Sequence, residues 1–306
     1  MRVAVLAGGR SLERAVSQRS GARVELALRR LGHDPVMLDA DARLGRRLAE
    51  ERLDAAIVAI HGRDGEDGTV QELLELAGVP YAGAGPAACV VASDKIATKR
   101  RLLAAGLPTA AFAPVSAGAV RDLGADALLG AIGDRVGLPL VVKPARGGSS
   151  LGVRRVDAES ELPAALLSAL AYGDHVLCER FVAGREIAVT VLADATLPAV
   201  EAIPQGAEGY DFDARYTPGA TEFVVPAEIG PESADAALAA CRLIGCSGFA
   251  RVDLLLPAAG PPQILELNTV PGLTETSLTP LAAQAAGMTF EDLVAALLES
   301  AQIAPR

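Results

Sequence analysis

Cysteine, net positive charge and long apolar runs are all scarce in this 306-residue sequence. The four cysteines form no CxxC pair and have no spacing typical of a metal site; they are Cys89, Cys178, Cys241 and Cys246. Three of the four lie in apolar stretches. We therefore expect buried free thiols in a reducing compartment, not disulfides.

Positive charge is outnumbered, because 28 Lys and Arg stand against 38 Asp and Glu and give a formal net charge of −10. Such a balance argues against sequence-independent binding of nucleic acid, which needs a basic surface. It still allows one lysine-lined pocket for a phosphate. No apolar run is long enough to span a bilayer, and the N-terminal run is too short for a signal peptide. We expect a cytoplasmic protein without nucleic-acid or membrane partners.

The length of the chain and its hydrophobic content of 51% predict two or three subdomains. The first, residues 1–84, alternates strand and helix patterns and ends near Gly83 and Gly85. Such alternation is typical of a parallel sheet covered by helices. Its expected elements are the strands Val3–Ala7, Pro35–Leu38 and Ala55–Ile60 and a helix over Val16–Leu31.

Two further subdomains are expected over residues 85–182 and 183–306. The stretch Pro204–Pro218 is polar and aperiodic, which is typical of a lid or a disordered segment. The expected elements are a helix capped by Ser93, a glycine-rich loop at Gly147–Gly152, and the strands Leu138–Lys143, Val176–Val182, Glu186–Leu192, Phe249–Leu256 and Gln263–Asn268.

The last two strands bring polar groups together. Because side chains alternate along a strand, Arg251 and Asp253 share one face, and Glu266 and Asn268 share a face of the partner strand. The opposite faces are apolar, with Ala250, Val252, Leu254, Leu256, Leu265 and Leu267. Two carboxylates and an amide suit Mg²⁺, which prefers hard oxygen ligands. The alternative is a solvated polar face with cross-strand charge pairs.

The glycine-rich loop follows Lys143 at the end of an apolar strand. Glycines at positions 147, 148 and 152 would let backbone N–H groups approach an anion closely. The alternative is an ordinary hairpin turn beside one solvated lysine.

A second glycine turn, Gly8-Gly9 after the first strand, imitates a dinucleotide-binding fold, with Asp39 as the ribose-binding acid. The full GxGxxG motif is missing, since Ser11 and Arg14 stand at its later positions. A nicotinamide-dependent oxidoreductase therefore stays open as an alternative, as does a non-catalytic ATP-binding module.

Several motifs occur in order along nearly the whole chain: GGRSLE (8–13), HGRDGEDG (61–68), KP with GSSLG (143–152), RVD (251–253) and ELNTVPGLT (266–274). With these motifs the chain resembles the D-alanine–D-alanine ligases of the ATP-grasp superfamily. The resemblance implies an α/β, ATP-grasp fold of three α/β subdomains with an N-terminal parallel-sheet domain. It also implies ligation of two D-alanines through an acyl phosphate, with release of ADP and phosphate, for peptidoglycan synthesis by a homodimer.

The resemblance also implies roles for individual residues. The catalytic group would be Glu13, Ser149, Tyr216, Arg251 and Gly272. ATP would be bound by Lys95, Lys143, Ser150, Glu179, Arg180, Phe181, Val182, Glu186 and Arg215. The substrate would be bound by Glu13, His61, Arg251, Gly272, Ser277 and Leu278. Two Mg²⁺ ions, with Mn²⁺ as an alternative, would be held by Asp253, Glu266 and Asn268.

Three positions depart from the common family pattern, namely Arg10, Ala15 and Arg215, and none of them removes an expected catalytic group. Arg215 keeps the charge of the usual lysine but changes its hydrogen-bond geometry. His61 has a structural role as its alternative, and Tyr216 could be a shielding aromatic instead of a member of a triad with Glu13 and Ser149. A D-alanyl-D-lactate or D-alanyl-D-serine product is the nearest alternative activity.

Overall fold

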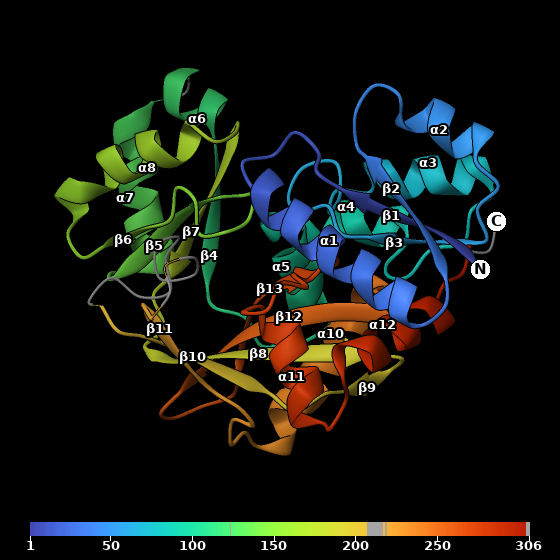
Figure 1. Cartoon of the computed structure of the whole chain (residues 1–306). Helices are drawn as coiled ribbons and strands as arrows, with labels where there is room; N and C mark the ends of the chain where they lie inside the picture. The colour runs from blue at the N-terminus through green and yellow to red at the C-terminus, as the bar shows by residue number, and fades with distance from the viewer. Residues whose placement is uncertain (123, 207–216, 218, 304–306) are drawn as a thin grey trace.

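The computed structural model describes residues 1–122, 124–206, 217 and 219–303. It has three lobes, each built on one sheet (Figure 1). The N-terminal lobe and the middle lobe stand side by side above the C-terminal lobe. The N-terminus lies beside the N-terminal lobe, and Gln302, near the end of the described residues, pairs with Tyr81 of that lobe.

The N-terminal sheet is parallel, as the alternation of elements predicts, with the order β2-β1-β3. Along β1, Val3 and Val5 face one core while Ala4 and Leu6 face another, which explains why the whole strand is apolar. The elements are β1 (Arg2–Ala7), α1 (Arg14–Arg30), β2 (Asp34–Asp39), α2 (Leu44–Glu50), β3 (Ala55–Val58) and α3 (Thr69–Ala77).

The two faces of this sheet are covered from different parts of the chain. Helices α2 and α3 cover one face. The other is covered by α1 and by the last helix, α12 (Phe290–Glu299), whose Leu293 and Leu297 are buried against Val24 and Leu28 of α1. Helix α12 is therefore packed into the core of the N-terminal lobe.

The middle sheet is antiparallel, with the order β4-β7-β5-β6. Strand β7 ends at Arg180, two residues before the expected end, and the chain then passes through residues 181–183 into β8. The elements are β4 (Phe112–Ser116), α6 (Ala117–Asp122), α7 (Ala125–Val136), β5 (Leu140–Pro144), β6 (Arg154–Val156), η1 (Glu159–Glu161), α8 (Leu162–Leu170) and β7 (His175–Arg180).

Two helices connect the first two lobes, α4 (Pro86–Ala92) and α5 (Lys95–Ala104). The prediction that Ser93 caps the second helix is wrong. The cap is Asp94, whose carboxylate accepts from the N–H groups of Ile96 and Ala97. A carboxylate can reach these first-turn donors, and Ser93 lies one residue too early to do so.

The C-terminal sheet has the order β11-β10-β8-β12-β13, with β9 paired to β8. Its apolar face packs against α10 and α4. Ile264, and not the expected Leu265, joins Leu267 in this core, because the register between β12 and β13 shifts at Asp253/Leu254 and leaves Leu265 as the extra residue of a bulge. The elements are β8 (Gly184–Leu192), β9 (Ala195–Thr196), β10 (Val200–Pro204), β11 (Thr221–Val224), α10 (Pro231–Ile244), β12 (Phe249–Pro257), β13 (Gln263–Asn268) and α11 (Leu278–Ala285).

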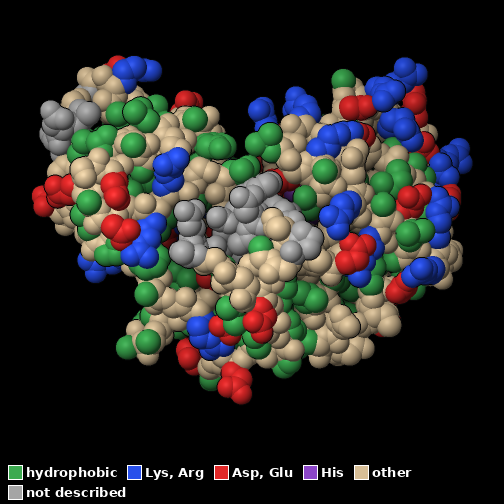
Figure 2. Space-filling view, turned by 60° about the vertical axis from the view of Figure 1, so that its left-hand side comes forward, with side chains coloured by type: hydrophobic (Ala, Val, Ile, Leu, Met, Phe, Trp, Pro, Cys, Tyr) green, Lys and Arg blue, Asp and Glu red, His purple; other side chains and the backbone are tan. Residues whose placement is uncertain are grey.

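All four cysteines are buried and unpaired, as predicted. Figure 2 shows Lys and Arg side chains interspersed with Asp and Glu over the face in view. Within the part of the chain that the structure describes, no single helix is long and apolar enough to cross a membrane. Helices α11 and α12 reach that length only together, and they bend by 102° at the break between them.

Candidate active site

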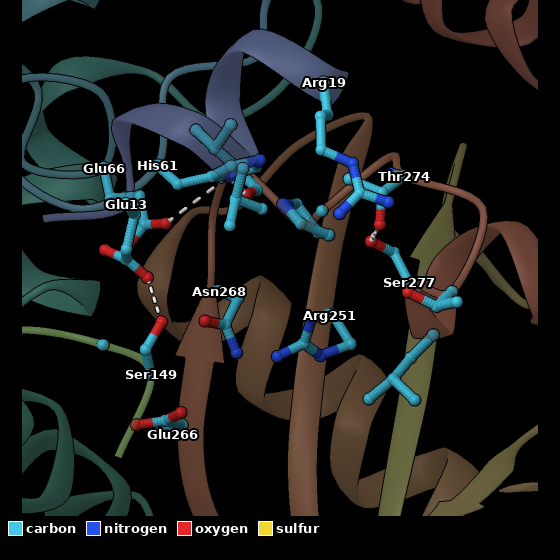
Figure 3. Close-up of a pocket in the computed structure, with 17 residues that line it drawn as sticks. Glu13, Arg19, His61, Glu66, Ser149, Arg251, Glu266, Asn268, Thr274 and Ser277 are labelled. Carbon is cyan, nitrogen blue, oxygen red and sulfur yellow. Dashed lines mark hydrogen bonds and ion pairs between the residues drawn. The ribbon is translucent and has the colours of Figure 1, made fainter. Parts of the chain in front are cut away.

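A cavity of about 120 Å³ lies where the three lobes meet (Figure 3). Nine of the residues proposed for the site line it: Glu13, His61, Ser149, Glu266, Asn268, Arg251, Gly272, Ser277 and Leu278. They come from all three lobes, although they are far apart in the sequence. The cavity is also lined by Glu66, Val16, Arg19, Thr274 and Thr276, which the sequence did not single out as site residues.

The N-terminal and middle lobes meet in the cavity through Glu13 and Ser149. The Ser149 hydroxyl donates to the Glu13 carboxylate, and the contact is visible in Figure 3. Gly62 makes room for that carboxylate, because a Cβ at position 62 would collide with Glu13. Ser149 and Ser150 have φ angles of 52° and 56°, a left-handed conformation that is unusual for serine and is often found at functional sites.

The polar face of the C-terminal strand pair is assembled as predicted. Arg251 forms two hydrogen bonds to Asp253, with Nε–Oδ1 at 2.7 Å and Nη2–Oδ2 at 2.8 Å. Asn268 donates from Nδ2 to the same carboxylate at 3.1 Å. Arg251 and Asn268 are cross-strand partners, as are Asp253 and Glu266. One arginine, one amide and two carboxylates thus project from a single patch of sheet.

The second carboxylate of this patch, Glu266, is linked through Lys95 to the glycine-rich loop at Gly147–Gly152. Lys95 Nζ lies 3.3 Å from Glu266 Oε2 and donates to the carbonyl of Gly147 at 2.6 Å. Helix α5 therefore joins the strand pair to the glycine-rich loop. Each carboxylate in the patch is paired with a cationic side chain, Asp253 with Arg251 and Glu266 with Lys95.

A third acidic group, Glu66, lines the same cavity as Glu13 and Glu266. Burial, together with the charges of the Glu13 and Glu266 carboxylates, raises the pKa of Glu66 to about 8. Glu66 is therefore mostly protonated at neutral pH. A protonated carboxyl can donate a hydrogen bond inside an otherwise acid-rich cavity.

His61 is held by hydrogen bonds at both ring nitrogens. Nδ1 lies 3.2 Å from the carbonyl of Val270 and Nε2 lies 3.0 Å from Ser20 Oγ. Because the carbonyl can only accept, Nδ1 carries the proton and Nε2 accepts from Ser20. Burial lowers the pKa of His61 to about 4, so its 3.9 Å approach to Glu66 is not a salt bridge at neutral pH. This geometry fits the structural alternative for His61.

Ser20 and Arg23 of α1 hold the loop that follows β13. The N–H of Leu273 donates to Ser20 Oγ at 3.3 Å. Arg23 Nη1 donates to the carbonyls of Leu273 and Thr274 at 3.1 and 2.9 Å, and its guanidinium stacks 3.7 Å from the centroid of Phe290. A helix of the first lobe thereby fixes the loop that carries Gly272 and Ser277.

The C-terminal end of this loop leads into α11. Ser277 Oγ accepts from the N–H of Thr274 at 3.1 Å and lies 2.8 Å from its hydroxyl. A Cβ at Gly272 would come within 2.7 Å of Ser277 Oγ, so the close approach requires glycine. Leu278 is the first residue of α11, and backbone N–H groups at a helix N-terminus favour an anion.

On the middle sheet, Lys143 and Glu179 form a buried ion pair, with Nζ–Oε2 at 2.7 Å. Within the described part of the chain, this ion pair is the contact that Glu179 Oε2 makes, and no hydrogen bond to it is formed. Glu179 Oε1 lies 3.3 Å from the Nζ of Lys99, a residue that the sequence did not single out.

The other described residues expected to bind the nucleotide do not line the cavity and are spread over β7, β8 and the connection between them. Arg180 turns its side chain to the carbonyl of Val136 at 3.0 Å, away from Glu179. Phe181 stacks under Arg155 at 4.2 Å. Val182 lies in the connection to β8, and Glu186 lies on β8. The expected roles of Arg215 and Tyr216 fall outside the described residues.

Four residues near the site were not predicted, although helical spacing or membership of a motif could have indicated them. Ser20 and Arg23 continue the i, i+3 spacing that starts at Ser17 on the buried side of α1. Lys99 follows Lys95 by four residues on α5 and so shares its helix face. Glu66 is part of the HGRDGEDG block.

The fold and the site together define a protein of the ATP-grasp class. The family model described as D-ala D-ala ligase C-terminus matches residues 102–299, and the one described as D-ala D-ala ligase N-terminus matches residues 40–84. The chain belongs to the D-alanine–D-alanine ligase family.

Individual relatives cover the chain from end to end. A D-alanine–D-alanine ligase of Anaeromyxobacter dehalogenans is 45% identical, with 99% of this chain and 97% of that protein aligned. One from Gloeobacter violaceus is 42% identical over 98% of this chain and 99% of that protein. The crystal structure of the Bacillus anthracis D-alanine–D-alanine ligase has a TM-score of 0.85 at 33% identity and covers 98% of this chain and 97% of that one. The same enzyme complexed with ATP gives 0.83 at 32% identity, with 98% and 97% covered.

Proposed function

We propose that this chain joins two D-alanines into D-alanyl-D-alanine, with ATP as co-substrate and ADP and phosphate as products. The dipeptide would supply peptidoglycan precursor synthesis. The observation that carries the proposal is the convergence of Glu13, Ser149, Arg251 and Ser277 from three lobes on one cavity in a chain of this family. The ATP complex of the Bacillus anthracis relative supports the choice of nucleotide.

In the proposed reaction, the carboxylate of the first D-alanine attacks the γ-phosphate of ATP, ADP leaves, and an acyl phosphate forms. The amine of the second D-alanine then attacks the carbonyl carbon, and phosphate leaves. Arg251 and the N–H of Gly272 would stabilise the oxyanion at that carbon. Losing one such donor typically costs about 3 kcal/mol of transition-state stabilisation.

The two amino acids would be held by different parts of the cavity. Glu13 would position the first D-alanine, and His61, whose ring nitrogens are both bonded within the protein, would line the binding site for it. Ser277 and the N–H of Leu278 would bind the carboxylate of the second, where the N-terminus of α11 favours negative charge. Protonated Glu66 would lower the repulsion between these carboxylates and the acidic wall.

ATP would lie between the middle and C-terminal sheets. Lys95, Lys143 and Ser150 would contact the phosphates. Backbone groups of residues 179–182 would read the adenine edge. Glu186 would bind the ribose hydroxyls, and Arg215 a phosphate from the Pro204–Pro218 segment, which would act as a lid.

The donor set of the strand pair fits a divalent metal. Asp253, Glu266 and Asn268 offer hard oxygen ligands on neighbouring strands, and the two carboxylates face Arg251 and Lys95 in this structure. We propose that these three residues hold two Mg²⁺ ions, with Mn²⁺ as the alternative. A bound metal would neutralise charge on the phosphate oxygens. The protein's own share is to place the acceptor carboxylate, the phosphates and Arg251 in one cavity.

Three further features belong to the same proposal. The subdomains would divide at residues 1–84, 85–182 and 183–306. The active form would be a homodimer in the cytoplasm, with no membrane or nucleic-acid partner. Tyr216 would complete a hydrogen-bonded triad with Glu13 and Ser149, for which the Glu13–Ser149 contact provides two members.

The proposal is tested by phosphate release with ATP and Mg²⁺ across a panel of D-alanine, L-alanine, D-serine and D-lactate, with the products identified by mass spectrometry. We expect ADP formation that depends on D-alanine, in step with the dipeptide. The proposal would be contradicted by ATP turnover that does not depend on D-alanine, or by a mixed product that dominates when all four compounds are present. NAD binding measured in the same preparation addresses the oxidoreductase alternative.

A further inference from the structure

Lys99 on α5 is a fully buried lysine beside the proposed ATP site, with 0% of its surface exposed. Its Nζ lies 3.3 Å from Glu179 Oε1, donates to Thr109 Oγ1, and lies 3.5 Å from the carbonyl of Ala110. The ring centroid of Phe112 is 5.6 Å away. The ammonium is thus enclosed by one carboxylate, two oxygen acceptors and an aromatic face.

Glu179 is shared between two lysines. Lys99 pairs with Oε1, while Lys143 pairs with Oε2 at 2.7 Å. Glu179 and Lys143 lie on neighbouring strands β7 and β5, and Leu177, the cross-strand partner of Lys143, packs on the same side with Phe112. All three ionised groups are at least nine-tenths buried, so they interact through a medium of low dielectric constant.

Two positive charges therefore face one negative charge. If Glu179 were paired with Lys143 alone, the pair would be neutral and would offer a nucleotide phosphate little attraction. With Lys99 on the other oxygen, the cluster keeps a net positive charge, and Lys143 is its member at the more exposed end. We propose that Lys99 is a positioning residue for the nucleotide: it neutralises Glu179 from behind and so leaves the charge of Lys143 available to the phosphates of ATP. This inference rests on the proposed function, in which Lys143 contacts those phosphates.

A purely structural role for Lys99 explains the site less well. Burying an ammonium is costly unless it is paired, and an apolar side chain of similar volume is often as stable or more so. Burial lowers the pKa of Lys99 to about 8, and Glu179 opposes that shift, so most molecules carry the charge at neutral pH. A charged lysine at a position that would suit methionine is expected where its charge has a function.

Thr109 connects Lys99 to the strand that carries the proposed metal ligands. Its hydroxyl accepts from Lys99 and donates to the carbonyl of Ile264 on β13 at 2.7 Å. Two residues further along, Glu266 pairs with Lys95, one helical turn before Lys99 on α5. Both lysines thus tie α5 to β13, and Lys99 also reaches the middle sheet.

The test is ADP binding by isothermal titration calorimetry in the presence of Mg²⁺, with the steady-state constants of the full-length protein. Lys99→Met removes the charge and keeps the volume. We expect it to weaken ADP binding by roughly tenfold or more and to raise KM for ATP, while KM for D-alanine changes less than about twofold. Arg100→Met, an exposed cation on the same helix, is the matched control and should bind ADP like the wild type.

The second part is a rescue. Glu179→Gln in the Lys99→Met background removes the negative charge that would neutralise Lys143, so the proposal predicts recovery of most of the lost ADP affinity. A defect of packing alone would not be repaired by that change. If Lys99→Met does not fold, Lys99→Gln gives the same test, because it also lacks the charge and retains a donor for Thr109.

Wild-type ADP affinity in Lys99→Met, or a loss that Glu179→Gln leaves in place, would overturn the inference. ADP binding needs no ligase turnover. A wild-type protein that binds ADP but makes no D-alanyl-D-alanine would therefore refute the proposed function and still leave the role of Lys99 measurable.

Discussion

His61 should make the stability of the protein depend on mild acid. Its ring is 5% exposed, and both nitrogens already have partners in Val270 and Ser20. Protonating Nε2 would turn an acceptor of the Ser20 hydroxyl into a second donor at a buried position. The perturbation we consider is His61→Gln, which cannot titrate and keeps one donor and one acceptor.

The size of the effect follows from the pKa. Burial lowers the pKa of His61 from 6.5 to about 4. Because the folded-state pKa lies below the unfolded one, this contribution is fully present above pH 6.5 and is lost as the pH falls toward 4. At about 1.4 kcal/mol for each unit, the loss comes to about 3 kcal/mol, a large share of typical domain stability.

The assay is urea unfolding of the wild type and His61→Gln at intervals between pH 7.5 and 4. The wild type should lose stability relative to the variant by about 3 kcal/mol over that range, since titrations shared by both proteins cancel. His175→Gln, at the exposed start of β7, is the matched control and should follow the wild type. Curves for wild type and His61→Gln that stay parallel would refute the neutral, doubly bonded His61 described above.

Three further substitutions test other parts of the site. Glu266→Gln removes a charge from the proposed metal site and should lower phosphate release by orders of magnitude with the fold intact, so near-normal turnover would reject the assignment. Arg23→Met removes two hydrogen bonds to residues 269–277, the substrate loop that follows β13 and carries Gly272 and Ser277. It should raise KM for D-alanine without changing ADP binding, whereas the exposed control Arg29→Met should change neither. Tyr216→Phe should raise the ratio of ester to amide product when D-alanine and D-lactate compete across pH, and an unchanged ratio at every pH would exclude that role.

Much of the fold could be predicted, because local patterns of apolar and polar residues determine it. The apolar run of β1 indicates a strand buried on both faces, and the period of two along β12 separates Arg251 and Asp253 from Val252 and Leu254. Prediction failed where one residue decided the geometry. The bulge at Leu265 exchanges the faces of Ile264 and Leu265, and a strict alternation cannot anticipate an inserted residue.

Among the site residues, too, those in local motifs could be predicted, and those placed by long-range contacts could not. Glu13, Ser149 and Arg251 could be predicted, because each lies in a recognisable motif and has a side chain whose chemistry suits the site. Ser20 and Arg23 have common side chains on an ordinary amphipathic helix, and their partners lie about 250 residues away in the sequence. No local pattern records such contacts.

Two helices position cavity residues that lie far from them in the sequence. Helix α1 fixes the substrate loop through Ser20 and Arg23, and α5 fixes β13 and the glycine-rich loop through Lys95 and through Lys99 with Thr109. The two sets of contacts share no residue, so their energetic effects should be close to additive. Substitutions on α1 should therefore act on the constants for D-alanine, and those on α5 on the constants for the nucleotide. A double variant of Arg23→Met and Lys99→Met should show the product of the two single effects; a clear departure from that product would mean that the two halves of the site are coupled through β13.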